Sequence, residues 1–190
     1  CGKDLWLLST GTGLAPFLSI LQEFDTWERY ENIVLVHSVR YRHELAYQEF
    51  IDSFQNNELF AEHAHKLKYV PVVTREQAER SWLNNRITCL LSNGELEAHV
   101  GLPINQERSR VMICGNPDMV QETRQILTDR GLTVSLRGNP GNLAVENYWY
   151  ASGFHISSAR RWLSCSHLAG VGLNGGQGNS KHNVIHQRAA

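Results

Sequence analysis

The chain has 190 residues, of which 42% are hydrophobic and 19% charged, and its formal net charge is −1 at pH 7. These values are typical of a soluble globular domain. They exclude the strong field with which basic proteins attract nucleic acid or anionic membranes. No apolar run approaches the ~18 residues of a membrane-spanning helix. We therefore expect neither a nucleic-acid nor a membrane partner.

The cysteines are widely spaced and form no CxxC pair, so they are interpreted as separate thiols in a reducing compartment, the cytoplasm. They are Cys1, Cys89, Cys114 and Cys165. His63 and His65 stand one residue apart without a matching cluster of ligands, and histidines of this kind are usually ordinary surface residues. We expect no metal site.

A glycine-rich turn near the start separates an apolar run at 5–8 from a helical pattern at 14–25. Glycine lets the backbone take positive φ and approach a ligand closely. The free N–H groups and positive dipole at the start of the following helix favour a pyrophosphate, although a tight turn without a ligand is the alternative. The candidate residues are Thr10, Gly11, Thr12 and Gly13.

Strand and helix patterns alternate along the chain. Short apolar runs predict strands at 5–8, 33–37, 67–73, 111–114 and 133–136. Helical patterns occupy 14–25, 42–54, 118–129 and, with an interruption near Gly94, 82–100. The order predicts an α/β fold, a doubly wound and mostly parallel five-stranded sheet with helices on both faces. Ligands of such sheets bind outside the carboxyl ends of the strands, where the strand order reverses.

The second predicted strand is followed by Ser38 and Arg40, where folds that prefer NAD usually place an acidic residue. A guanidinium is suited to a 2′-phosphate instead. Arg75 and Arg86 follow the third strand and can reach the same edge. We interpret the set of Arg40, Arg75 and Arg86 as a 2′-phosphate site. Each arginine alone reads as a surface charge, and we keep that reading for Arg42.

The fourth predicted strand ends at Cys114 and is followed by Gly115 and Asn116. Asn116 is suited to cap the helix that begins at Pro117. This pattern places a thiol and a glycine backbone at the carboxyl edge of the sheet. A cysteine at the end of a strand is most often only a small buried hydrophobic residue.

The segment after the last predicted strand carries a carboxylate and two aromatic residues, Glu146, Tyr148 and Trp149. The aromatic rings either pack against the core or stack on a flat cofactor. Residues 150–190 are rich in Ser, Gly, Asn and His without sustained periodicity. We expect one domain at 1–149 followed by a disordered tail at 150–190.

Residues 4–149 resemble the NADP-binding half of bacterial ferredoxin/flavodoxin–NADP reductases. The resemblance rests on STGTGLAPF at 9–17, on VTRE at 73–76 with NNRI at 84–87, on VMICGNPDM at 111–119 and on VENYW at 145–149. It implies that hydride passes from NADPH to FAD and that single electrons then pass to ferredoxin or flavodoxin. We expect a monomer.

The resemblance also implies individual roles. Cys114 positions the nicotinamide, Glu146 is a carboxylate near the flavin, Tyr148 covers the flavin face and Trp149 lies along FAD. These roles make Cys114, Glu146 and Tyr148 the catalytic candidates. The cofactor-binding candidates are Thr10, Gly11, Thr12, Gly13, Ser38, Arg40, Arg75, Arg86, Gly115, Asn116, Tyr148 and Trp149.

Nothing in the chain matches the flavin motif that the family carries on an N-terminal barrel. We therefore expect that this polypeptide alone does not hold FAD and shows no reductase turnover. One alternative is the NAD(P)H-binding part of an oxygenase reductase component. Those proteins usually prefer NADH and often carry an iron–sulfur domain. Another is a fragment that only binds NADPH, in which Cys114 and the segment Glu146–Trp149 would have no purpose.

Overall fold

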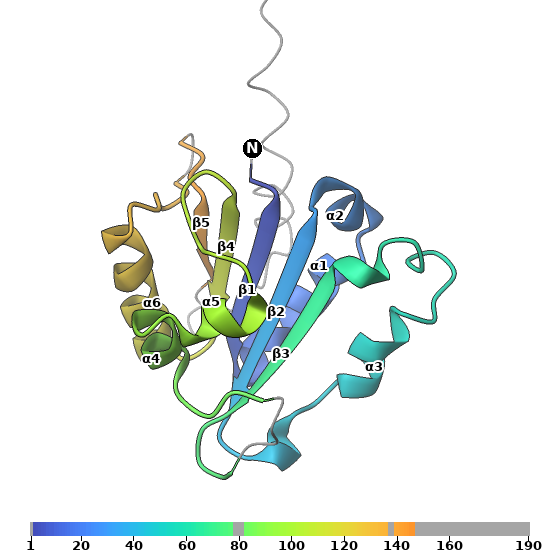
Figure 1. Cartoon of the computed structure of the whole chain (residues 1–190), viewed down its shortest axis with the longest axis horizontal. Coiled ribbons are helices and arrows are strands. Elements are labelled where there is room, and N and C mark those ends of the chain that lie inside the picture. Colours follow the sequence, from blue (N-terminus) through green and yellow to red (C-terminus); the bar gives the residue numbers. More distant parts are fainter. Residues whose placement is uncertain (1, 78–81, 137–138, 147–190) are drawn as a thin grey trace, which may run out of the picture.

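A five-stranded parallel sheet forms the centre of the molecule (Figure 1). The computed structural model describes residues 2–77, 82–136 and 139–146. The strands are β1 (Asp4–Thr10), β2 (Asn32–Val39), β3 (Leu67–Val73), β4 (Ser109–Cys114) and β5 (Leu143–Glu146), in the spatial order β3-β2-β1-β4-β5. All four neighbouring pairs are parallel. The predicted α/β class is confirmed.

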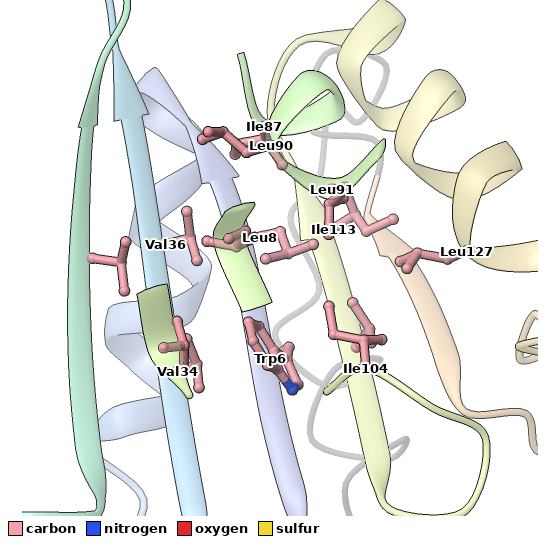
Figure 2. Packing of buried hydrophobic residues seen from close by; sticks show 14 of the residues in the cluster. Trp6, Leu8, Val34, Val36, Ile87, Leu90, Leu91, Ile104, Ile113 and Leu127 are labelled. Atoms are coloured by element: carbon pink, nitrogen blue, oxygen red, sulfur yellow. The ribbon is translucent and has the colours of Figure 1, made fainter. Parts of the chain in front are cut away.

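Helices cover both faces of the sheet because the central strands are apolar on both sides. The helices are α1 (Ala15–Leu21), α2 (Phe24–Arg29), α3 (Gln48–Ser53), α4 (Ile87–Ser92), α5 (Glu95–Val100) and α6 (Pro117–Asp129). Leu5 and Leu7 of β1 face the cluster formed with α1, α2 and α3. Trp6 and Leu8 face the opposite cluster, formed with α4, α5 and α6 (Figure 2). Figure 1 shows α1 behind the sheet and α5 in front of it.

The strand order reverses at β1, because β2 and β3 lie on one side of it and β4 and β5 on the other. Parallel strands end at the same edge, so the loops after all five strands meet there. In register, Thr10 lies opposite Ser38 of β2, and Ser9 lies opposite Cys114 of β4. The fold therefore places the candidate residues of distant segments along one edge.

The prediction of a fifth strand at 133–136 is wrong, because the sheet takes 143–146 as β5 instead. Val134 forms only an isolated bridge to Leu143, and Leu136 is 65% exposed. The segment 143–146 pairs with β4 along its Leu-Ala-Val run. Residues 133–136 therefore lie beside β5 and form no strand of the sheet.

The helix predicted at 118–129 is confirmed as α6, whereas the other predicted helices are shorter or divided. The pattern at 14–25 divides into α1 and α2, and the pattern at 42–54 keeps a helix only at α3, preceded by a 3₁₀ turn, η2 (Arg42–Glu44). The interruption at Gly94 is confirmed, since this residue takes φ 75° between α4 and α5. Asn116 caps α6 as predicted, accepting hydrogen bonds from the N–H groups of Asp118 and Met119.

The carboxyl-terminal expectations fall largely outside the described residues. These are the positions of Tyr148 and Trp149 and the tail at 150–190. Of Glu146, only the backbone is described, at the end of β5. In the part of the chain that the structure describes, every helix is too short or too polar to cross a membrane.

Candidate functional site

The glycine turn after β1 packs against the loop after β4. The turn is a 3₁₀ helix, η1 (Gly11–Leu14), that leads directly into α1. A Cβ atom at Gly13 would lie 2.4 Å from the carbonyl oxygen of Cys114, so only glycine fits this close approach. Gly11 has φ 52° and open space around its Cα, and Thr12 is exposed. The exposed part of the turn is thus free to face a ligand.

Thr10 joins the two loops at the point where the strand order reverses. Its hydroxyl accepts a hydrogen bond from the backbone N–H of Asn116 at 2.9 Å. Gly115 beside it has φ 145°, and a Cβ atom there would lie 2.1 Å from Thr10 Oγ1. The close contact requires glycine at 115, and the hydroxyl proton of Thr10 remains available to donate.

His37 lies beneath the glycine turn and is 1% exposed. Burial lowers the pKa of the ring to about 4, and a hydrogen bond to the backbone of Gly11 opposes this shift. Nδ1 is buried without a hydrogen-bond partner. The ring is therefore neutral at pH 7, and it contacts η1 through the backbone of Gly11. The resemblance to the reductase family did not indicate a role for His37.

Arg40 and Arg75 lie side by side at the ends of β2 and β3. The N–H of Thr74 donates to the Val39 carbonyl at 3.0 Å, and the N–H of Arg75 donates to the Arg40 carbonyl at 2.9 Å. The pairing of the two strands therefore continues through both arginines. Ser38, two residues before Arg40, is buried, with only 4% of its surface exposed.

Arg86 follows a segment that is tied back to β3. The N–H of Val73 donates to the Leu83 carbonyl at 3.0 Å, and the side-chain amide of Asn84 donates to the Val73 carbonyl at 2.9 Å. Arg86 stands directly before α4, at its N-cap position, and is exposed. The structure thus brings Arg40, Arg75 and the backbone of Arg86 to the same edge of the sheet.

Further contacts connect the loops after β2 and β3. The carboxylate of Glu76 accepts a hydrogen bond from the backbone N–H of Arg42, and the amide of Asn84 donates to the carbonyl of Glu76. The Arg42 guanidinium lies 5.2 Å from the centre of the Trp82 ring, a cation–π distance. Arg42 is exposed, which agrees with its interpretation as a surface charge, and it also takes part in this loop structure.

Glu44 is an acidic residue in η2, in the loop after β2, and it was not among the residues predicted for this edge. Its carboxylate forms an ion pair with the Arg40 guanidinium at 2.7 Å. It also accepts hydrogen bonds from the backbone N–H groups of Arg40 and Tyr41, each at 2.9 Å. These bonds lower the pKa of Glu44 to about 2. The sequence feature that could have indicated this ion pair is the i,i+4 spacing of Arg40 and Glu44.

Cys114 is fully buried at the end of β4, within the core cluster on the α1 side. Its backbone lies at the carboxyl edge, opposite Ser9 of β1 and Glu146 of β5. A covered thiol is a poor nucleophile, because reaction requires an accessible thiolate. The arrangement suits a residue that shapes the edge between β1 and β5.

The candidate residues form a row along the carboxyl edge. From one side to the other they are Arg75 after β3, Ser38 and Arg40 at β2, the turn 10–13 after β1, Cys114, Gly115 and Asn116 after β4, and Glu146 at β5. Arginines occupy one end of the row and the glycine turn its middle. An elongated ligand that carries phosphates can bind along such a row.

The chain is similar to known reductases. The family described as an oxidoreductase NAD-binding domain matches residues 7–125. The chain is 46% identical over 149 residues to a ferredoxin–NADP reductase of Pseudomonas aeruginosa, covering 76% of this chain and 57% of the relative. It is 45% identical over 148 residues to a flavodoxin/ferredoxin–NADP reductase of Escherichia coli, covering 77% and 57%.

Among solved structures, the chain is similar to a ferredoxin NADP⁺ reductase from Neisseria gonorrhoeae with bound FAD and NADP. The TM-score is 0.68 and the identity 36%, over 77% of this chain and 56% of that one. The chain thus spans little more than half the length of these relatives. The family match covers most of the described sheet, and the chain belongs to the oxidoreductase NAD-binding domain family.

Proposed function

We propose that the chain is the NADP(H)-binding half of a ferredoxin/flavodoxin–NADP reductase. The observation that carries this proposal is the backbone pairing of Arg40 with Arg75 beside the glycine turn. Two guanidinium groups on adjacent strand ends, with a third on Arg86, offer charge-assisted bonds to a phosphate dianion. The similarity to ferredoxin–NADP reductases supports the same assignment.

The row of residues fits an extended dinucleotide. The 2′-phosphate is assigned to the arginine end, with Ser38 beside it. The pyrophosphate is assigned to the turn 10–13, where the Thr10 and Thr12 hydroxyls and the backbone N–H groups can donate. The nicotinamide is then assigned to the edge at Cys114–Asn116. In this arrangement, the close packing of Gly13 and Gly115 sets the spacing between the pyrophosphate and nicotinamide ends.

The full reaction requires FAD, and NADPH supplies a hydride to it when both are bound. In our proposal Cys114 acts by positioning, which agrees with its buried thiol. Glu146, Tyr148 and Trp149 are proposed to face the flavin, as in the reductases that the chain resembles. The proposed partners are ferredoxin or flavodoxin, and the proposed location is the cytoplasm, as a monomer.

The arginine assignment is tested by calorimetric titration of the 190-residue chain with NADP⁺ and NAD⁺, which differ only in the 2′-phosphate. We expect the native chain to prefer NADP⁺. Each of R40A, R75A and R86A should weaken NADP⁺ binding by about tenfold, because each removes a charge-assisted bond. Binding of NAD⁺ should not change.

The matched control is R124A, on the exposed surface of α6 away from this edge. It should bind both nucleotides as the native chain does. Equal affinities of the native chain for NADP⁺ and NAD⁺ would remove the basis of the proposal.

A further inference from the structure

We propose that Glu44 is a positioning residue that holds the Arg40 guanidinium and the start of the loop after β2 in the geometry that receives the 2′-phosphate. This inference rests on the proposed function and assigns Glu44 a part in selecting NADP(H) over NAD(H). Glu44 itself would not touch the phosphate. Its effect would pass through Arg40.

Three donors converge on the Glu44 carboxylate. Oε2 accepts from the backbone N–H groups of Arg40 and Tyr41, each at 2.9 Å, and Oε1 accepts from Arg40 Nη2 at 2.7 Å. Backbone and side chain of Arg40 are therefore fixed by the same group. A flexible arginine has to lose rotamer freedom when it binds a ligand, and prior fixation reduces that cost.

The same residue is fixed from the other side by β3. The Arg40 carbonyl accepts the hydrogen bond from the Arg75 N–H at 2.9 Å, so the peptide groups on both sides of the Arg40 Cα are held. Movement of Arg40 would therefore disturb its alignment with Arg75. Hydrogen bonds thus connect Glu44 to Arg40 and Arg40 to Arg75, and they hold the backbones of the two arginines in one arrangement.

The ion pair leaves Arg40 able to bind a phosphate. A guanidinium has five N–H donors in a planar fork, and the Glu44 bond is made at Nη2. The Arg40 side chain is 60% exposed, against 26% for Glu44. The carboxylate is therefore the more covered partner and the guanidinium the more accessible one. This asymmetry suits a carboxylate that orients and a guanidinium that binds.

A positioning role is distinct from a stabilising one. Exposed ion pairs contribute about 0–1 kcal/mol to folding, so the loss of this pair should change stability little. The pKa of Glu44 is about 2, because Arg40 and the two N–H groups stabilise the carboxylate. Glu44 is consequently ionised from pH 5 to 9, and any effect of its replacement should be independent of pH across that range.

The test is calorimetric titration of the 190-residue chain and its variants with 2′,5′-ADP and with 5′-AMP, which lacks only the 2′-phosphate. We expect E44A to bind 2′,5′-ADP about fivefold more weakly than the native chain and 5′-AMP equally well. E44Q should be intermediate, because its amide oxygen can still accept from a backbone N–H. The matched control E49Q, an exposed neighbour on α3, should bind both probes like the native chain.

The outcomes separate this inference from the proposed function. If the native chain binds 2′,5′-ADP no better than 5′-AMP, both are refuted. If the native chain discriminates and E44A binds 2′,5′-ADP as tightly as native, or more tightly, only the role of Glu44 is refuted. Tighter binding would mean that the carboxylate repels the phosphate more than it orders Arg40. Equal weakening of both probes would also refute it, since that indicates a general structural effect.

Discussion

The Thr10 hydroxyl and the Asn116 backbone N–H are joined by a hydrogen bond of 2.9 Å, although 106 residues separate them in sequence. This bond connects the loops after β1 and β4. T10V keeps the shape of the side chain but removes the acceptor. We expect it to cost about 1 kcal/mol in the free energy of unfolding, measured by denaturant titration.

The same variant should weaken NADP⁺ and NAD⁺ binding to the same extent, because both nucleotides share the pyrophosphate that is assigned to this turn. T10S, which retains the hydroxyl, is the control and should bind both nucleotides as the native chain does. A selective loss of NADP⁺ binding in T10V would contradict the placement of Thr10 at the pyrophosphate.

Two glycines of one turn should respond differently to alanine. At Gly13 a Cβ atom would lie 2.4 Å from a backbone oxygen of Cys114, so G13A must push the two loops apart. At Gly11 the space is open, and the φ of 52° alone opposes a side chain. G11A should cost about 1–2 kcal/mol and G13A clearly more. Chemical unfolding of both variants measures the difference, and a smaller cost for G13A would show that the loops separate easily.

The sequence predicted the positions of the candidate residues best where these residues follow the end of a predicted strand. Thr10, Arg40 and Cys114 were placed by the rule that parallel strands end together. The strand register agrees with this placement for Thr10 and Cys114, and the Arg75–Arg40 backbone hydrogen bond agrees with it for Arg40. The fifth strand was misplaced because 133–136 and 143–146 are both short apolar runs. Only pairing with β4 decides between them, and pairing is a long-range property.

The residues that sequence reasoning missed act through contacts between separate segments. In the sequence, Glu44 lies beyond the position at which NAD-binding folds carry an acidic residue. Only the turn η2 brings its carboxylate into contact with Arg40. In the sequence, Asn84 is an ordinary loop residue, and only the structure shows that its amide donates to the Val73 carbonyl. Hydrogen bonds of this kind depend on loop geometry, which residue types alone do not determine.

The two described cysteines should differ in reactivity towards thiol reagents. Cys89 is exposed, whereas Cys114 is fully buried. In the folded chain, iodoacetamide should label Cys89 readily and leave Cys114 protected until the chain unfolds, since alkylation requires access to the thiolate. Peptide mass spectrometry after timed labelling checks this expectation. Rapid labelling of native Cys114 would mean that the sheet edge between β1 and β5 opens. The thiol could then also react as a nucleophile, in addition to its positioning role.

The stability of the chain should fall at acid pH through His37. Its pKa is about 4 in the folded state and 6.5 for the unperturbed group, so the unfolded chain binds a proton more readily. Stability is therefore complete above pH 6.5 and declines as the pH falls towards 4, by a total on the order of 3 kcal/mol. Denaturant unfolding of the native chain between pH 4 and 8 should show this slope, and H37Q should show a shallower one.

The matched control is H65Q, which removes an exposed histidine and should keep the native slope. If H37Q does not fold, an NMR titration of the native chain gives the same information, because the His37 ring should stay neutral at pH 5. A ring that becomes protonated near pH 6.5 in the folded chain would contradict the burial of His37 beneath Gly11. The contact between the His37 ring and the backbone of Gly11 would then also form with a protonated ring.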